Sequence, residues 1–231
     1  MPDRRGSGLN REQRGHAESP RQCIDDARAA LDVLIADTGA TAAHLVGVSW
    51  GGKLAALLAA EAPEQVVSLT LIAPGFFPKV DVPALEKMRI ALSLVNDRER
   101  RFDIPLQDAW LFTSNPERME YVARDKLMLT QVTASFLLAS RRMDRMVRRF
   151  AESPYRGPVH LILAGRDRII HNDRTRAWLR GLPSADLRLT EYPDAEHTLE
   201  FEAEPARFFS DLVGWIGDRC KQSALPNDAL R

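Results

Sequence analysis

The chain has 231 residues, and its 32 lysines and arginines balance 32 aspartates and glutamates, so the formal net charge is zero. This length can bury a full core and predicts one domain with an insertion, while the balanced charge gives no electrostatic reason to bind nucleic acid. No apolar run reaches the roughly 18 residues of a membrane-spanning helix, and the polar, arginine-rich start (1–16) does not have the pattern of a secretory signal.

In the first third of the chain, a loop and a helix are predicted to precede two strands. Residues 1–18 have a loop-like composition, and Ser19-Pro20 has the pattern of a helix N-cap followed by a proline in the first turn. We expect this helix to end at Gly39. The pattern then predicts a strand (43–48), a helix (52–62) closed by Pro63, and a second strand (66–73) stopped by Pro74-Gly75.

Between residues 79 and 153 the strand signals disappear, and helical patterns follow that are broken near Pro83, Pro105 and Pro116. We expect a helical insertion between two strands of the sheet, forming a cap that covers a site and selects the substrate. The alternative is a helical layer with a packing role alone.

The last third of the chain alternates strands and helices. Strands are predicted at 159–164 and 186–192, and helices at 173–181 and 204–218. The strand at 186–192 has more alternating polarity, which is typical of a position near a sheet edge. This alternation predicts an α/β fold with a mostly parallel sheet and flanking helices. The expected domains are a core (1–78 and 154–220), a helical cap insertion (79–153) and a C-terminal tail (221–231).

Gly47-Val48-Ser49-Trp50-Gly51 follows the pattern G-x-S-x-G between a predicted strand and a predicted helix. This order of strand, sharp turn and helix is typical of a nucleophile elbow, in which the serine backbone is strained and the flanking glycines let neighbouring backbone approach. Ser49 Oγ is expected at the carboxyl end of a strand and at the positive end of a helix dipole. We therefore interpret Ser49 as a nucleophile.

A serine nucleophile needs a base, and chain position ranks the five histidines. His197 follows the last predicted strand, and loops that follow parallel strands gather on the side where Ser49 emerges, so His197 is the best candidate. The others lie elsewhere: His16 in the polar N-terminal loop, His44 at the start of the strand before the elbow, His160 inside a strand, and His171 in a loop.

The base needs an orienting acid, and Asp167 directly follows the apolar run at 161–164 and its turn. Asp173 and Asp194 are the alternatives, but Asp173 is better placed to cap the following helix and Asp194 to form a turn. The order Ser49, Asp167, His197 differs from the orders of the two familiar serine-protease folds.

With these residues the chain resembles the α/β-hydrolase superfamily, and it is most similar to the esterase, lysophospholipase and monoacylglycerol-lipase-like branch that includes the serine aminopeptidase type. The elbow (47–51), the acid loop (163–170) and the Glu196-His197 loop match in order and spacing. Asp3-Arg-Arg-Gly6-Ser-Gly8 is similar to the family's D-x-R-G-x-G loop. The resemblance covers residues 3 to about 218, and it implies Ser49 as nucleophile, Asp167 as acid, His197 as base and the Trp50 backbone N–H as one oxyanion donor.

The sequence also departs from the family. We expect the N-terminal strands that precede the family's D-x-R-G-x-G loop to be absent, and no residue matches the family's second oxyanion donor, whose loss costs roughly 10²–10³ in turnover. The strand at 43–48 is then expected to have an open edge, which favours self-association. A misplaced start codon, a truncated gene and a missing half supplied by another chain all fit this departure.

The sequence specifies the substrate only weakly. Apolar side chains that are candidates for an acyl pocket are Phe76, Phe77, Leu85, Met88, Leu92, Trp110, Phe112, Met119, Leu127, Met128, Phe136 and Leu137. On a helix, four arginines share one side (Arg141, Arg145, Arg148 and Arg149), opposite Met143, Met146 and Phe150. That basic side is either a solvated face or a contact for an anionic head group.

The favoured function is a serine hydrolase that cleaves small or lipid-like carboxylic esters through an acyl-enzyme. An aminopeptidase-type peptidase is a variant that needs acidic residues to bind the free amine, and the sequence does not place them. The alternatives are a truncated, catalytically impaired chain that acts only as a binding or remnant protein, and an acyltransferase, because the same triad can pass the acyl group to an alcohol.

No metal or organic cofactor is expected, because the sequence contains no Cys/His cluster with metal-ligand spacing. The two cysteines, Cys23 and Cys220, give no disulfide framework. The expected compartment is therefore the cytoplasm.

Overall fold

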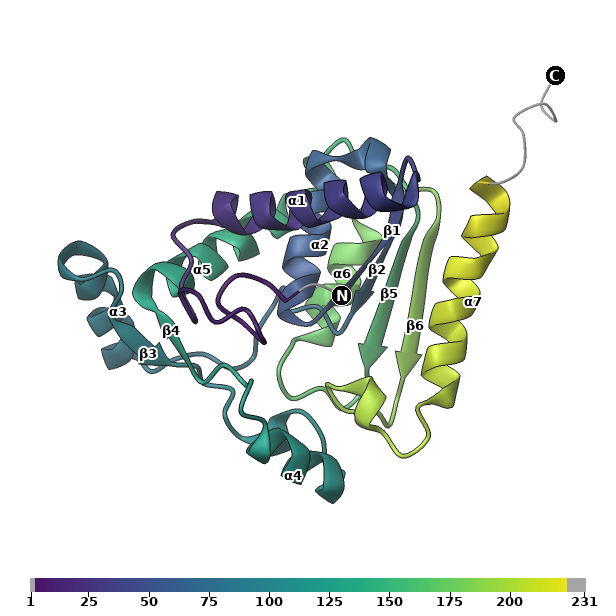
Figure 1. Ribbon diagram of the computed structural model, residues 1–231. Helices are drawn as coiled ribbons and strands as arrows, with labels where there is room; N and C mark the ends of the chain where they lie inside the picture. Colours follow the sequence, from purple (N-terminus) through teal and green to yellow (C-terminus); the bar gives the residue numbers. More distant parts are fainter. Residues whose placement is uncertain (1–2, 224–231) are drawn as a thin grey trace.

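A parallel four-stranded sheet lies at the centre of the molecule (Figure 1). The structure is a computed structural model, and it describes residues 3–223. The strands are β1 (Ala43–Val48), β2 (Val66–Ile72), β5 (Val159–Ala164) and β6 (Leu187–Tyr192), in the order β1-β2-β5-β6. Each is parallel to its neighbours. The predicted α/β class is confirmed, and β6 lies at an edge, as its alternating pattern indicates.

Helices cover both faces of this sheet. Figure 1 shows α2 (Trp50–Glu61) and α6 (Asn172–Arg180) on one side, α7 (Ala206–Ser223) on the other, and α1 (Pro20–Thr38) along α2. At the start of α1, Ser19 Oγ accepts a hydrogen bond from the N–H of Gln22 at 3.2 Å. Gly39 ends the helix with a left-handed φ of 67°. Both ends of α1 therefore follow the capping rules that predicted them.

Several helix bounds differ from the prediction by one to five residues, most at the end of α7. The helix α2 begins at Trp50 rather than residue 52, because the turn at Ser49 leads directly into it, and the 3-10 turn η1 (Pro63–Gln65) follows its end. The helix α7 continues to Ser223, so the first three residues of the predicted tail (221–231) are helical. The rest of that tail, 224–231, lies outside the described residues. In the described range, no helix has the length and apolar character needed to cross a membrane.

The main hydrophobic core surrounds the two central strands. Leu69 and Leu71 of β2 and Leu161 and Ile162 of β5 are fully buried. Burying each such side chain contributes about 1.5–3 kcal/mol. Both faces of these strands are covered, so their sequences are nearly continuous apolar runs, whereas the edge strand β6 alternates.

The insertion between β2 and β5 contains helices and a small β-ribbon. Its elements are α3 (Ala84–Asn96), β3 (Arg101–Asp103), η2 (Ala109–Leu111), α4 (Pro116–Arg124), β4 (Gln131–Thr133), α5 (Ala134–Arg148) and η3 (Phe150–Glu152). The expectation of an insertion without strands was wrong, because β3 and β4 pair antiparallel. Three-residue strands are too short to show an alternating pattern, and their pairing joins residues that are far apart in sequence.

The N-terminal loop packs against the insertion. The N–H of Thr133 donates to the carbonyl of Gly15 at 3.0 Å, and Thr133 Oγ1 lies 3.2 Å from His16 Nδ1. His16 is buried, although it occurs in a polar stretch of sequence. Tertiary contact with β4 and α5 decides its environment, which the composition of residues 1–18 does not reveal.

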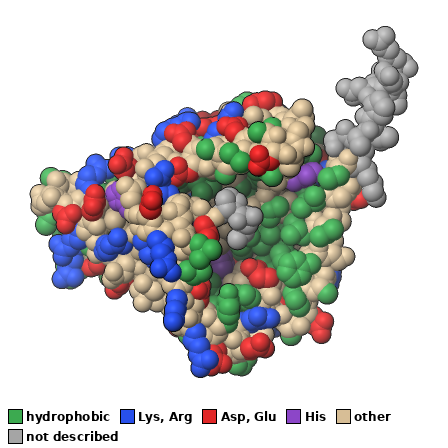
Figure 2. Space-filling model, viewed as in Figure 1, with side chains coloured by type: hydrophobic (Ala, Val, Ile, Leu, Met, Phe, Trp, Pro, Cys, Tyr) green, Lys and Arg blue, Asp and Glu red, His purple; other side chains and the backbone are tan. Residues whose placement is uncertain are grey.

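The outer edge of β1 pairs with no strand within residues 3–223. Figure 2 shows hydrophobic side chains gathered over the sheet beside α7, and Val46 and Val48 of β1 are 43% and 40% exposed. This is the open edge that the sequence leads us to expect. Self-association through it stays a prediction.

The basic side of α5 is exposed, as the helical pattern indicates. Arg141 forms an ion pair with Asp81, and the guanidinium of Arg148 lies 5.7 Å from the centroid of the Phe77 ring. On the side opposite the four arginines, Met143 is buried, whereas Met146 is 39% exposed. The physical reason is the helical period, which places Met146 one turn beyond the exposed Arg142.

Candidate active site

Ser49 occupies a strained turn between β1 and α2. Its φ is 47° and its ψ is −119°, and a positive φ is unfavourable for a residue with a side chain. Its carbonyl accepts hydrogen bonds from the N–H groups of Gly52 at 3.0 Å and Gly75 at 2.8 Å, and its own N–H donates to Ile72 at 2.9 Å. These three bonds hold the strained backbone in place.

Close packing explains only one of the two glycines that flank the turn. A Cβ on Gly47 would lie 2.7 Å from the Ala55 Cβ, so this position excludes a side chain. A Cβ on Gly51 would meet no atom within 4 Å. The second close approach is at Gly52, where a Cβ would lie 2.8 Å from the Pro74 Cβ. The expectation for Gly51 was therefore wrong, because the helix turns this residue away from the loop that follows β2.

His197 and Ser49 meet although 148 positions separate them in the chain. His197 lies in the loop after β6, and its Nε2 is 2.9 Å from Ser49 Oγ. Its side chain is 3% exposed. Because the strands are parallel, the loop after β6 lies at the same edge of the sheet as the carboxyl end of β1, where the elbow begins.

Asp167 holds the other side of the His197 ring. Its Oδ2 lies 2.7 Å from His197 Nδ1, while its Oδ1 accepts the N–H groups of Ile169 at 2.7 Å and Ile170 at 3.0 Å. A carboxylate oxygen only accepts, so this contact places a proton on Nδ1 and leaves Nε2 as an acceptor toward Ser49. The structure thus brings all three sequence-predicted residues together in the order serine, imidazole and carboxylate.

The other titratable candidates lie away from this cluster. His16 contacts β4, and His44 Nδ1 lies 2.8 Å from Ser68 Oγ. His160 is buried against Trp215 of α7, and His171 precedes α6. The alternative acids are both exposed: Asp173 pairs with Arg176, and Asp194 pairs with Arg166.

Sequence reasoning missed a clamp that Arg168 and Glu196 form beside Asp167 and His197. Arg168, next to Asp167, forms an ion pair with Glu196, which precedes His197. The guanidinium of Arg168 also lies 3.7 Å from the centroid of the Trp110 ring and donates to the Trp110 carbonyl at 2.7 Å. The clamp therefore connects the acid loop, the base loop and the insertion. The adjacency of these charges to Asp167 and His197 was the available signal in the sequence.

Trp50 is fixed by several contacts beside Ser49. It is the first residue of α2, so its backbone N–H has no acceptor within the helix. Its indole Nε1 donates to Ser140 Oγ at 3.0 Å, and its ring stacks on Phe136 with centroids 5.3 Å apart. The backbone at this position is therefore well anchored.

A cavity of about 580 Å³ opens beside Ser49 and Trp50. Most of its wall is apolar and comes from α3, the segment 104–138 and Ile169-Ile170. Four of the sequence candidates line it: Phe112, Met128, Phe136 and Leu137. Phe112 also packs edge-on against the His197 ring, with centroids 6.0 Å apart.

The remaining candidates for the acyl pocket do not line this cavity. Leu85, Met88 and Leu92 are exposed on the outer side of α3, because Ile90 and Leu94 occupy its inner side. The hydrophobic pattern of α3 does not distinguish the two sides, since both are apolar. Only the packing of α3 over the elbow does so.

The carboxylates in the cavity wall are paired with cations. Lys53 Nζ lies 2.6 Å from Asp144 Oδ1, and this buried pair joins α2 to α5. Burial lowers the pKa of Lys53, and the nearby Asp144 opposes that effect. Asp81 pairs with Lys87 at 2.6 Å and with Arg141. Among the described residues of the wall, no carboxylate is left to hold a substrate amine.

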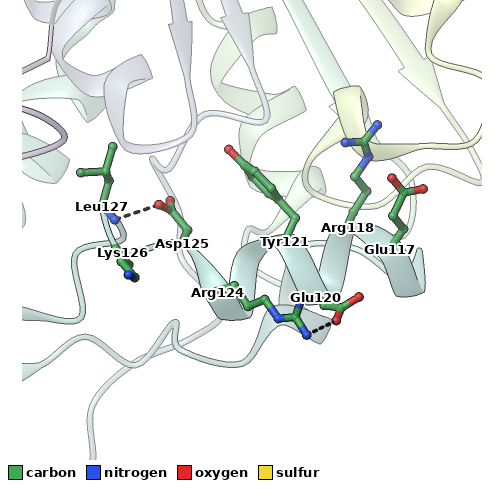
Figure 3. A pocket seen from close by; sticks show the side chains of 8 residues that line it. All are labelled: Glu117, Arg118, Glu120, Tyr121, Arg124, Asp125, Lys126 and Leu127. Atoms are coloured by element: carbon green, nitrogen blue, oxygen red, sulfur yellow. Dashed lines mark hydrogen bonds and ion pairs between the residues drawn. The ribbon is translucent and has the colours of Figure 1, made fainter.

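A second hollow, of about 490 Å³, runs along α4 (Figure 3). Side chains of both charges line it: Glu117, Arg118, Glu120, Tyr121, Arg124, Asp125, Lys126 and Leu127. Arg124 and Glu120 pair with each other at 2.5 Å. None of Ser49, Asp167 and His197 lines this hollow, so we assign it no part in the chemistry.

Comparison with known proteins places the chain in a family. The sequence model of the family described as "Serine aminopeptidase, S33" matches residues 1–204. A curated relative, the "Dihydrolipoyllysine-residue acetyltransferase component of acetoin cleaving system" of Cupriavidus necator, is 28% identical over 199 residues. This match covers 81% of the chain and 50% of the relative, so the chain spans about half the length of that protein.

Several solved structures share the fold. A monoacylglycerol lipase of Paleococcus ferrophilus superposes with a TM-score of 0.80 at 19% identity, over 93% of this chain and 80% of the lipase. A soluble variant of monoglyceride lipase from Saccharomyces cerevisiae, in complex with a substrate analog, also gives 0.80, at 16% identity over 94% of this chain and 76% of that chain. At these identities the likeness shows a shared fold.

Proposed function

This chain belongs to the serine aminopeptidase S33 family and has the α/β-hydrolase fold of the lipase and esterase branch, and on that premise we propose that it is a serine hydrolase. Its proposed substrates are carboxylic esters of small or lipid-like acyl groups. One observation carries the proposal. Ser49 Oγ, the His197 ring and the Asp167 carboxylate form a continuous chain of contacts of 2.9 and 2.7 Å on a strained elbow. This arrangement supports nucleophilic acyl transfer.

In the proposed mechanism, His197 Nε2 takes the proton of Ser49 as Oγ attacks the ester carbonyl. The Trp50 N–H stabilises the developing oxyanion. His197 then returns the proton to the departing alcohol, and an acyl-enzyme remains. Water loses a proton to His197, attacks the acyl-enzyme and releases the acid. Asp167 keeps the imidazole tautomer correct and stabilises its charged form.

The proposed division of the chain follows from this mechanism. Residues 1–78 and 154–220 form the catalytic core, and the insertion 79–153 acts as a cap that selects the substrate. The apolar wall contributed by α3 and the segment 104–138 supports this role, because it lies over Ser49 and suits a hydrocarbon chain.

An ester is favoured over a peptide with a free amino terminus. A peptidase of the aminopeptidase type would hold a substrate ammonium group with acidic side chains. The two carboxylates of the cavity wall, Asp81 and Asp144, already pair with Lys87 and Lys53. Their charge is neutralised, which argues against amine recognition in this cavity.

A fluorophosphonate probe tests the proposal directly. The wild-type protein should be labelled, while Ser49→Ala and heat-denatured wild type should not. Ser135→Ala is a matched control, because Ser135 lies in α5 and contacts Thr133 rather than His197. Absence of labelling in a folded wild-type sample would contradict the proposal and favour a binding or remnant protein.

Acyl transfer to an alcohol is the second candidate, because the curated relative from Cupriavidus necator is an acetyltransferase component. The same acyl-enzyme serves both reactions, and only the acceptor differs. Product analysis with glycerol or short alcohols as acceptors separates them. Release of free acid alone supports hydrolysis, and formation of a new ester supports transfer.

Neither a metal nor an organic cofactor has a role in this mechanism. We propose a cytoplasmic location, because the two cysteines in the sequence supply no disulfide framework. Ester hydrolysis should be unchanged by EDTA, and fractionation of the native cells checks the location.

A further inference from the structure

Arg4 contributes a cation to the cavity beside the nucleophile. Its guanidinium lies 4.6 Å from the centroid of the Trp50 ring and 4.9 Å from that of Phe136, and Arg4 and Ser49 line the same cavity. The two stacked aromatic rings hold the guanidinium plane in place. The Arg4 guanidinium is therefore held beside Trp50, the residue that follows Ser49.

No carboxylate within residues 3–223 neutralises Arg4. Within the described part of the chain, the guanidinium makes one hydrogen bond, to the carbonyl of Arg5 at 3.4 Å, although a guanidinium offers five donors. Arg5 differs, because it makes two hydrogen bonds to Asp26, at 2.8 and 2.7 Å. Burial lowers the pKa of Arg4 and the nearby Arg14 lowers it further, while Cys23 opposes this effect.

The charge of the whole cavity wall is also positive. Among the described residues, five cationic side chains line it (Arg4, Lys53, Lys87, Arg141 and Arg145), against two carboxylates, Asp81 and Asp144. Lys53, Lys87 and Arg141 pair with those carboxylates. Arg145 is exposed, so Arg4 is the partly buried cation whose charge is left for a ligand.

We propose that Arg4 binds an anionic group of the substrate, so that the substrate class is an ester that also carries a carboxylate or a phosphate. This inference rests on the proposed function, because the ester lies at Ser49 while the anionic group reaches the guanidinium. Both groups present paired oxygens that match the planar guanidinium. The apolar part of the wall accepts the hydrocarbon of the same substrate.

Two matched ester pairs test this proposal and identify the anion. The carboxylate pair is 4-nitrophenyl hemisuccinate and 4-nitrophenyl butanoate, and the phosphate pair is 1-lauroylglycerol 3-phosphate and 1-lauroylglycerol. The ratio of kcat/KM for the anionic ester to that for the neutral ester is measured in wild type, Arg4→Met and Arg174→Met. Arg174 is exposed on α6 outside the cavity wall, so it controls for the change in net charge.

Arg4→Met should lower this ratio by roughly tenfold or more in at least one pair, because a hydrogen bond to a charged group is lost. The neutral esters and Arg174→Met should be unaffected, and the pair that responds tells carboxylate from phosphate. An unchanged ratio in both pairs would overturn the proposal. An equal loss on neutral and anionic esters would also overturn it, because Arg4 would then act on the reaction or the fold rather than on an anion.

A binding measurement keeps this inference separate from the proposed function. Calorimetry on Ser49→Ala gives the Kd of each ester without turnover, with and without Arg4→Met. A roughly tenfold weaker binding of an anionic ester alone supports the inference even if wild type hydrolyses nothing. Equal affinities refute it even if wild type is an active esterase.

Discussion

Replacing Asp167 by asparagine is expected to keep the fold and remove the base. The oxygen at the Oδ1 position accepts the N–H groups of Ile169 and Ile170, so the asparagine carbonyl must take this place. Its NH₂ group then faces His197 Nδ1 and donates to it. The imidazole proton moves to Nε2, which points at Ser49 and can no longer accept the serine proton.

The expected loss is about 10⁴ in kcat, the size seen when the orienting acid of a serine triad is replaced by its amide. That factor equals about 5.5 kcal/mol of transition-state stabilisation. The assay is hydrolysis of 4-nitrophenyl butanoate, with circular dichroism and thermal melting to show that the variant is folded.

Asp194→Asn is the matched control, because Asp194 is exposed and pairs with Arg166 rather than with the imidazole. Its kcat should equal that of wild type. If Asp167→Asn keeps more than about a tenth of the wild-type kcat, a loss below 1.4 kcal/mol, then Asp167 does not orient the base and the assigned tautomer is wrong.

Three further predictions concern stability. Gly52→Ala should lower the free energy of unfolding by about 1–3 kcal/mol, because a Cβ would lie 2.8 Å from a proline Cβ, whereas Gly51→Ala should leave it unchanged or raise it by up to about 1 kcal/mol. Asp144→Asn leaves the buried Lys53 without its carboxylate and should cost about 3 kcal/mol in urea denaturation. Loss of the carboxylate should lower the folded-state pKa of Lys53 further, so the deficit relative to wild type should shrink as pH rises from this lower pKa toward the folded-state pKa of Lys53 in wild type. Burial lowers the pKa of His160 to about 4, so its contribution, about 3 kcal/mol, should be complete above pH 6.5 and be lost as pH falls to about 4.

Matched variants decide each case. Equal melting temperatures for Gly52→Ala and Gly51→Ala would argue against close packing at the elbow. The double variant Lys53→Met/Asp144→Leu should recover most of the stability lost in Asp144→Asn, since an apolar pair replaces the buried charges. His160→Gln should flatten the pH dependence between 4 and 6.5, and an unchanged slope would assign it to other groups.

The sequence by itself is sufficient to predict the strands of the sheet and the three residues that meet at the elbow. Continuous apolar runs mark the buried strands β2 and β5, because both faces of a central parallel strand are covered. Glycine and proline mark the turns at which those strands end. Asp167 and His197 each follow a strand directly, and the carboxyl ends of parallel strands lie on one side of the sheet.

Only the tertiary structure decided which side chains share the cavity. Arg4 meets Trp50, and Lys53 meets Asp144, across 46 and 91 positions of sequence. The ribbon of β3 and β4, the burial of His16 and the outward face of α3 also depend on packing between distant elements. Backbone sterics and hydrophobic periodicity act over neighbouring residues, so they predict elements and turns. Pairing between side chains that are far apart in sequence depends on how those elements pack against one another. A local sequence pattern does not contain that information.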